Sequence, residues 1–203
     1  MDQVVKQAIE EMRRKGFEVV EMETAADAKR YLTEQIGAGQ SVGLGGSVTI
    51  RDLDVLPALK AKGCAVCDAW TAKTKREAWD AARMADVYLS SANAVTNTGS
   101  LVFIDGSCNR VGAIADGPAT VLFVISQAKF VDGGIHTATA RIKRVACPRN
   151  ARRLGLHTPC AETGVCREPE CGDDCMCRIV MTVDRVPHGR RMVVLVVEEA
   201  LGY

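Results

Sequence analysis

Five of the nine cysteines lie in one short segment near the carboxyl end of the chain. The segment reads PCAETGVCREPECGDDCMC and holds Cys160, Cys166, Cys171, Cys175 and Cys177. Thiolates are soft ligands that suit zinc and iron–sulfur clusters, and four that converge on a metal can order a loop that has no core. The spacing matches neither a zinc ribbon nor a ferredoxin run. The pattern favours a metal or cluster site over incidental loop cysteines, and it does not identify the metal.

The other four cysteines are weaker candidates for metal ligands. Cys64 and Cys67 lie on a predicted strand, where positions three apart face opposite sides, so we expect buried structural thiols. Cys108 lies in a predicted turn, and Cys147 lies just after a predicted helix. Neither is favoured as a ligand.

A glycine-rich segment, VGLGGSVT, follows a predicted strand and precedes a predicted helix. Glycines let backbone amides approach a ligand, and a helix start favours an anion. The segment is neither G-x-G-x-x-G nor a P-loop, so a simple tight connection remains an alternative, as does a helix cap formed by Thr49 with Asp52. The candidate binding residues here are Gly43, Gly45, Gly46, Ser47 and Thr49.

A second polar segment, NAVTNTGS, follows the predicted strand DVYLSS. Its Asn97, Thr98 and Gly99 are further candidates for binding a small polar ligand. In a parallel α/β sheet, ligands bind outside the carboxyl ends of the strands. We therefore expect both segments on one rim, where they would hold a small organic acid or a phosphate.

No catalytic set is evident. His136, His157 and His188 are scattered and have no obvious acid partner. Asp105 and Asp116 are candidate acids only through their proximity to the loops, and Asp105 equally fits a turn residue in DGSCN.

The elements that must position these residues alternate between strands and helices up to about residue 144. Helices are predicted over 2–15, 24–36, 49–63, 74–84 and 133–144, with Thr24 and Asp27 as a capping box, and strands lie between them. This alternation predicts a single α/β domain, residues 1–203, with a mostly parallel sheet and helices on both faces. Residues 148–177 break the pattern and predict a Cys-rich loop. Two strands joined by PHGR follow, which we expect to form an antiparallel pair at the sheet edge.

Composition excludes several classes of protein. The 203 residues carry a net charge of +1, and aromatic residues make up only 4%, which argues against a nucleic-acid-binding face. No segment has the roughly 20 apolar residues that span a bilayer, and the N-terminus has no signal core. We therefore expect a cytoplasmic protein, where thiols stay reduced. Exposed edge strands favour a homodimer.

Together, SVGLGGSVT, LSSANAVTNTGSLVFIDGSCNRV, PCAETGVC and the terminal VVEEALGY resemble the LUD-domain family, which includes the lactate-utilisation protein C group. The resemblance covers nearly the whole chain. It implies a three-layer α/β/α fold similar to the sugar-phosphate isomerase and CoA-transferase-like superfamily. It also implies a role in lactate oxidation beside iron–sulfur partner proteins.

The resemblance also bears on the cysteines. Its subgroup with cysteines has the shape C-x5-C-x2-C-x6-C, which Cys160, Cys166, Cys171 and Cys177 match by position, and it favours a 4Fe–4S cluster. The second gap is longer here and the third shorter, and Cys175 is an extra cysteine that could replace Cys171 or Cys177. Many relatives carry an acidic residue at the position of Asn97, so no catalytic role is transferred to that position.

Three functional hypotheses follow. The first is a redox-linked LUD domain with an iron–sulfur cluster in the Cys-rich loop and a small anionic ligand at the glycine rim. The second is a non-catalytic binding module with a structural zinc. The third is an isomerase-like or CoA-transferase-like enzyme, which rests on fold resemblance alone.

Overall fold

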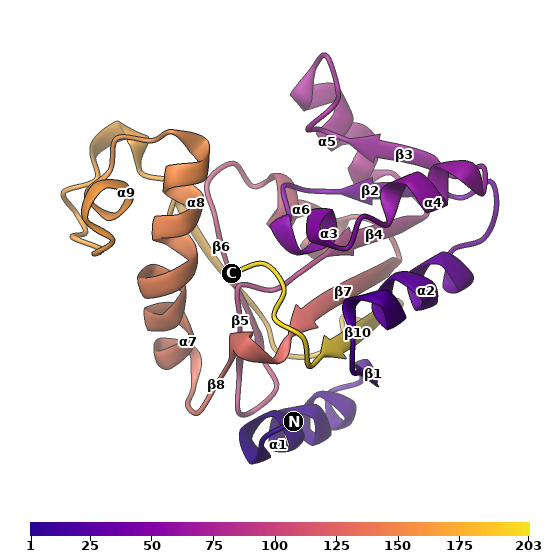
Figure 1. The fold of residues 1–203 in the computed structure, drawn as a ribbon, viewed down its shortest axis with the longest axis horizontal. Helices are drawn as coiled ribbons and strands as arrows, with labels where there is room; N and C mark the ends of the chain where they lie inside the picture. The colour runs from indigo at the N-terminus through magenta and orange to yellow at the C-terminus, as the bar shows by residue number, and fades with distance from the viewer.

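A six-stranded, all-parallel sheet forms the centre of the protein (Figure 1). The structure is a computed structural model that describes all residues, 1–203. The strand order is β1-β10-β7-β4-β2-β3. The bounds are β1 Glu18–Met22, β2 Ser41–Leu44, β3 Ala65–Asp68, β4 Val87–Ser90, β7 Thr120–Ser126 and β10 Arg191–Val197.

The nearly continuous apolar sequence of β7 explains its central position. Its residues TVLFVIS are all buried except Thr120, as expected of a strand that is covered on both faces. Leu122 and Val124 belong to one hydrophobic cluster, whereas Val121, Phe123 and Ile125 belong to another. The alternation of side chains along the strand thus feeds two separate cores.

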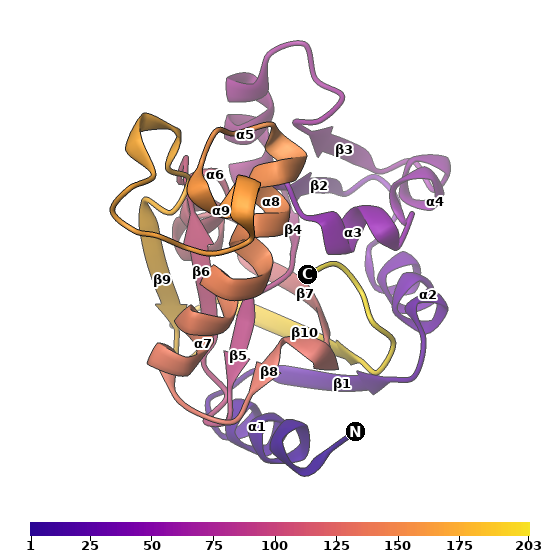
Figure 2. The same cartoon turned by 60° about the vertical axis from the view of Figure 1, so that its left-hand side comes forward.

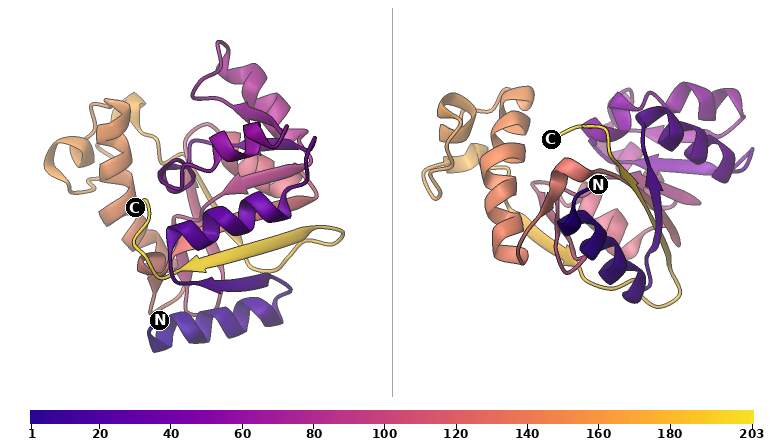
Figure 3. Two further views of the ribbon diagram at one scale, coloured as in Figure 1. Left: turned by 45° about the vertical axis from the view of Figure 1, so that its right-hand side comes forward. Right: turned by 60° about the horizontal axis from the view of Figure 1, so that its bottom comes forward.

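Helices α2 (Ala25–Gln35), α3 (Val48–Asp52) and α4 (Leu56–Ala61) supply the core on one face of this sheet, through side chains such as Leu32, Ile50 and Leu59. Helices α1 (Gln3–Arg14), α5 (Lys75–Arg83) and α6 (Asn109–Asp116) contribute to the opposite core. Figure 3 shows α1 and α2 on opposite sides of β10. The predicted α/β/α architecture is confirmed.

The predicted capping box at the start of α2 is also confirmed. The Thr24 hydroxyl accepts the backbone N–H of Asp27, and the Asp27 carboxylate accepts the backbone N–H of Thr24, each at 3.2 Å. The single helix predicted over 49–63 is instead two short helices, α3 and α4.

A second sheet, which the sequence did not predict, packs beside the first (Figure 2). Its order is β8-β5-β6-β9, with bounds β5 Ala94–Thr96, β6 Leu101–Asp105, β8 Phe130–Val131 and β9 Ile179–Val183. Its Val95, Leu101 and Phe103 join the core of the central sheet. Its Val102 and Ile104 pack against a long helical segment, α7 (Ile135–Arg141), a π-helical turn (Ile142–Ala146) and α8 (Cys147–Leu154).

Two predictions for the carboxyl-terminal third are wrong. Residues 148–177 are not one unstructured loop, because they include most of α8, the short helix α9 (Pro159–Thr163) and a 3₁₀ turn at Gly172–Asp174. Ala151, Cys160 and Ala161 form a small buried cluster there, with Leu156 and Met176 packed against it.

The last two strands do not pair with each other. β9 is antiparallel to β6 in the second sheet, whereas β10 lies between β1 and β7 in the central sheet. The difference in burial explains this. Six residues of β10 are buried, which suits a central parallel strand, while β9 is largely half-exposed. No helix of the protein is both long and apolar enough to cross a bilayer.

Candidate functional site

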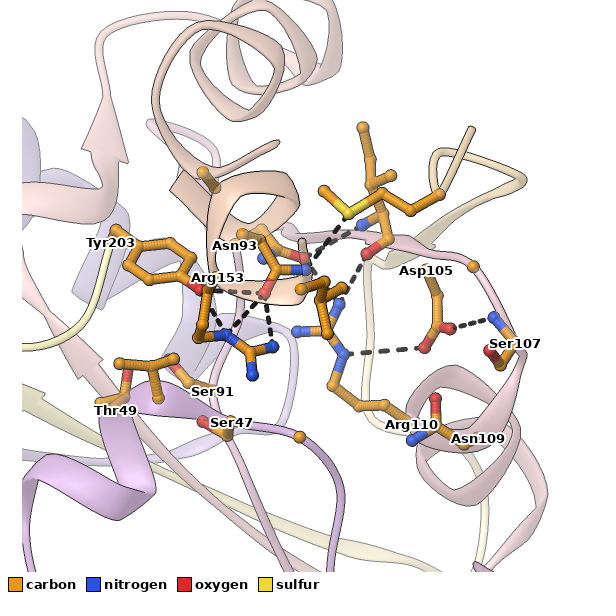
Figure 4. Close-up of a pocket in the computed structure, with 18 of the residues that line it drawn as sticks. Ser47, Thr49, Ser91, Asn93, Asp105, Ser107, Asn109, Arg110, Arg153 and Tyr203 are labelled. Atoms are coloured by element: carbon orange, nitrogen blue, oxygen red, sulfur yellow. Dashed lines mark hydrogen bonds and ion pairs between the residues drawn. The ribbon is translucent and has the colours of Figure 1, made fainter. Parts of the chain in front are cut away.

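A cavity of about 560 Å³ lies where β2 and β4 of the central sheet end (Figure 4). Its walls come from the β2–α3 connection, the segment that follows β4, the β6–α6 connection, α8 and the C-terminal residue Tyr203. Figure 4 shows Ser47, Thr49 and Ser91 on one side and Asp105, Ser107 and Asn109 on another, with Arg153 and Arg110 between them. A cavity of this size at the carboxyl ends of parallel strands is typical of a small-molecule site.

Lys129 is the most unusual residue of the cavity wall. It follows β7 in a 3₁₀ turn, Gln127–Lys129, and is only 3% exposed. Its Nζ donates to Thr49 Oγ1 at 2.8 Å, to Ser91 Oγ at 3.0 Å and to the Ala92 carbonyl at 3.4 Å. No carboxylate pairs with it. Burial, together with the positive charges of Arg141 and Arg110, lowers the pKa of Lys129 to about 7.

The cavity carries an excess of positive charge. Five cationic side chains line it, and Asp105 is its one acidic side chain. That carboxylate already accepts the backbone N–H groups of Ser107, Cys108 and Val111 at 2.9–3.2 Å. The unbalanced charge therefore favours an anionic ligand. The five cations are Arg51, Lys75, Arg110, Lys129 and Arg153.

Arg110, on α6, is fixed in the cavity wall by several polar partners. Its guanidinium donates to Asn93 Oδ1 and to the Ile104 carbonyl, both at 2.7 Å, and lies 3.8 Å from the Asp105 carboxylate. Burial lowers its pKa, and the negative charge of Asp105 opposes that effect. Such fixed donors bind an anion with little loss of side-chain entropy.

Arg153, on α8, is oriented from three sides. Its Nε lies 3.1 Å from Asn150 Oδ1 and 3.2 Å from the Tyr203 hydroxyl, and its guanidinium is 5.0 Å from the Trp70 ring centre. Arg51 approaches the same ring at 3.8 Å. Contact with the Trp70 ring thus helps to fix two of the cations that line the cavity.

Three of the five residues predicted in the glycine segment line the cavity, namely Gly46, Ser47 and Thr49. Ser47, rather than Thr49, caps α3, since its Oγ accepts the Ile50 N–H at 3.4 Å. Gly45 lies just behind the wall, and a Cβ there would be 2.8 Å from the Tyr88 hydroxyl. Gly43 has a packing role, because a Cβ there would be 2.3 Å from the Ala82 carbonyl oxygen of α5.

Asn97, Thr98 and Gly99 do not line the cavity. They form the turn between β5 and β6 in the second sheet, where Asn97 Nδ2 donates to Asp132 Oδ1 at 3.1 Å. Gly99 has φ +78°, and a Cβ there would be 2.7 Å from the backbone nitrogen of Met12 in α1. The expectation that both polar segments share one rim is therefore wrong. The residues that follow β4 and do line the cavity are Ser91, Ala92 and Asn93.

Of the remaining candidate acids and bases, only Asp105 lies in the cavity wall. Asp105 lines it but serves as the turn residue that the sequence suggested. Asp116 and the three histidines His136, His157 and His188 are absent from its walls.

A second cavity, also about 560 Å³, adjoins the first at Lys129 and Tyr203. Arg141, Arg144 and Arg149 line it, and no acidic residue does. The charges of Arg144 and Arg149 lower the pKa of Arg141, after the larger effect of burial. These cations add to the positive potential around Lys129.

The cysteines of the carboxyl-terminal segment gather near the start of α8 and include one that the sequence did not favour. Cys147 Sγ lies 3.3 Å from Cys177 Sγ. The hydrogen bond between them raises the pKa of Cys147, which burial raises further, and lowers the pKa of Cys177. Cys160 and Cys166 interact electrostatically with both Cys147 and Cys171. Burial and the neighbouring Cys175 raise the pKa of Cys171 to about 11.

The donor chemistry of these six thiols suits a metal or cluster, but their arrangement supplies pairs rather than a closed site. No three His, Cys, Asp or Glu side chains converge to hold a metal ion. Four thiolates would have to move together to bind a cluster. The other three cysteines, Cys64, Cys67 and Cys108, lie outside the group. Cys64 is buried as predicted, whereas Cys67, which was also expected to be buried, is only partly buried.

Sequence reasoning missed Lys129, Arg110 and Arg153. No spacing motif marks them, because β7, α6 and α8 bring them together from distant parts of the chain. One signal was available for Lys129: a lysine three residues after a buried parallel strand falls on the rim where ligands bind.

Comparison with known proteins identifies the family. The LUD domain model matches residues 5–197. A crystal structure of a DUF162 family protein from Deinococcus radiodurans has a similar fold, with a TM-score of 0.55 and 12% sequence identity over 96% of each chain. No curated protein matches the chain. The match over nearly the whole length confirms the family predicted from sequence, and the chain belongs to the LUD-domain family.

Proposed function

We propose that this LUD domain binds a small carboxylic acid, of the 2-hydroxy or 2-oxo acid class that includes lactate and pyruvate, in the cavity at Lys129. The observation that carries the proposal is the buried Lys129 ammonium, which contacts hydroxyl and carbonyl oxygens and has no carboxylate partner. A buried charge without a counter-charge is costly. A bound carboxylate would supply the missing negative charge.

The other polar groups of the cavity suit the same class of ligand. Arg153 offers a planar pair of donors that matches a carboxylate. Asn93, Ser91 and Ser47 offer hydrogen-bonding groups for the hydroxyl or oxo oxygen next to it. The name of the family, in which LUD refers to lactate utilisation, supports the same class of ligand.

Calorimetric titration with L-lactate, pyruvate and inorganic phosphate tests the proposal. Wild-type protein should bind one organic acid per chain, and Lys129→Met should weaken that binding at least tenfold, as expected when one buried charge-assisted contact of about 1.5–3 kcal/mol is lost. Lys60→Met, at an exposed site on α4, is the matched control and should bind normally. Phosphate that binds while both organic acids do not would reject the ligand class.

A second candidate function is thiol-based and belongs to the redox hypothesis. The gathering of six cysteines supports it, with Cys147 and Cys177 in contact. In this hypothesis, the segment 160–177 closes around a 4Fe–4S cluster, with zinc as the alternative, and an iron–sulfur partner protein of lactate oxidation exchanges electrons with it in the cytoplasm. Metal and sulfide analysis of protein purified without oxygen tests this hypothesis.

Replacement of both Cys160 and Cys166 by Ser should abolish the metal content. Cys64→Ser, outside the group, should leave it unchanged. If the double variant kept its full metal content, these cysteines would not be the ligands.

A further inference from the structure

Lys129 has the surroundings of a reactive amine as well as those of a charge anchor. A lysine that only balances charge is normally fixed as an ammonium by a carboxylate. Here the neighbours of Nζ are the Thr49 and Ser91 hydroxyls and the Ala92 carbonyl. A hydroxyl both donates and accepts, so the same neighbours satisfy the ammonium and the neutral amine.

The charges that face Lys129 favour the neutral form. Arg141 from α7 and Arg110 from α6 both oppose its positive charge, and Asp52 at the end of α3 exerts a weaker opposite effect. Burial acts in the same direction as the two arginines. Desolvation and nearby cations are the two means by which proteins activate a lysine for nucleophilic attack.

We propose that Lys129 is a nucleophile that condenses through Nζ with the carbonyl carbon of a small 2-oxo acid in the cavity to form an imine. The inference rests on the proposed binding of a small carboxylic acid. When Lys129 is neutral, Arg110 and Arg153 would hold the carboxylate in its place, so that the carbonyl carbon can approach Nζ in the same cavity. The Lys129 side chain reaches the cavity directly, since it forms part of the wall.

The reaction balances without an oxidant or reductant. The Nζ lone pair forms the N–C bond while the carbonyl π electrons move to oxygen. Two protons leave nitrogen, and the oxygen departs as water as the C=N double bond forms. The Thr49 and Ser91 hydroxyls, both within 3.0 Å of Nζ, can relay these protons from nitrogen to oxygen.

Reductive trapping tests the inference. Pyruvate is added to the full-length protein at pH 8, borohydride then reduces any imine to a stable secondary amine, and the intact mass is measured. The expected result is one reduced pyruvyl adduct per chain, which peptide mapping locates at Lys129. L-lactate, which has no carbonyl carbon, should give no adduct.

Two variants separate this inference from the proposed function. Lys129→Arg keeps the positive charge but cannot form the imine, so it should bind L-lactate in a calorimeter and give no adduct. Lys60→Met should give the wild-type adduct. Circular dichroism checks that each variant is folded, and Lys129→Met provides a second nucleophile-free variant.

The possible outcomes are distinguishable. If wild-type protein binds L-lactate and pyruvate but is not trapped, or if the adduct persists in Lys129→Arg, the imine is refuted and the binding function stands. If neither acid binds and no adduct forms, both proposals fail. An adduct that is confined to Lys129 supports both.

Discussion

Raising the pH from 7 to 9 should weaken the binding of L-lactate by up to about fifty-fold. The lowered pKa of Lys129, about 7, places the loss of its positive charge within this range. If only the ammonium form attracts the carboxylate, affinity falls by about tenfold per pH unit above the pKa. Lactate stays ionised throughout, because its own carboxyl titrates far below this range.

Calorimetric titrations at pH 6, 7, 8 and 9 in constant salt measure the effect. Lys129→Arg is the matched control, since its guanidinium stays charged, and its affinity should change little between pH 7 and 9. Comparison with this control also separates the titration of Lys129 from the effect of other groups on lactate affinity, such as the thiols near Cys147. An affinity that is independent of pH in the wild type, or an equal decline in Lys129→Arg, would refute the role given to Lys129.

Four further predictions concern stability and metal binding. Lys129 loses its proton near pH 7 in the folded protein but only near 10.5 in the unfolded chain, so the free energy of unfolding should rise with pH between these values. The rise should reach up to about 1.4 kcal/mol per pH unit relative to Lys129→Met, as measured by urea titration. Gly43→Ala should lower the free energy of unfolding by about 1–3 kcal/mol in the same assay, because its Cβ would lie 2.3 Å from the Ala82 carbonyl oxygen. Gly134→Ala, whose Cβ would meet no neighbouring atom, should lower it less. Thr24→Ala should cost about 1 kcal/mol by loss of the capping box, and Thr24→Ser should cost little; equal losses would argue against the cap. Cys147→Ser should lower the metal content of anaerobically purified protein if Cys147 is a ligand, and an unchanged content would exclude it.

The alternating pattern of the sequence predicted a mostly parallel central sheet, but not the position of β10 within it. Buried parallel strands have a continuous apolar sequence, which β7 and β10 both show. The apolar run RMVVLVV could have identified β10 as a central strand, but the turn residues PHGR suggested a hairpin. The prediction gave more weight to the turn residues than to the burial pattern, and it therefore missed the pairing of β9 with β6.

The candidate site was only partly predictable. Gly46, Ser47 and Thr49 line the cavity because they directly follow β2, as the rule for parallel sheets requires. Asn97–Gly99 were misplaced because the chain leaves the central sheet after β4 and enters the second sheet before it reaches them. These three residues form the tight turn of the β5–β6 hairpin and do not line the cavity.

The cysteine group shows a different limit. Cys160 to Cys177 stand out in sequence because they are close together, whereas Cys147 is 13 residues from the nearest of them. The helix α8 and the return of the chain toward β9 bring Cys147 against Cys177. Contacts of this kind depend on tertiary structure and leave no spacing motif.

A crystal structure of the protein grown with L-lactate would show whether the cavity at Lys129 binds the acid. We expect the carboxylate in the cavity at the C-terminal ends of β2 and β4, in contact with Lys129 Nζ or Arg153. A well-ordered lactate bound elsewhere, or an empty cavity at a lactate concentration that saturates binding in solution, would contradict it.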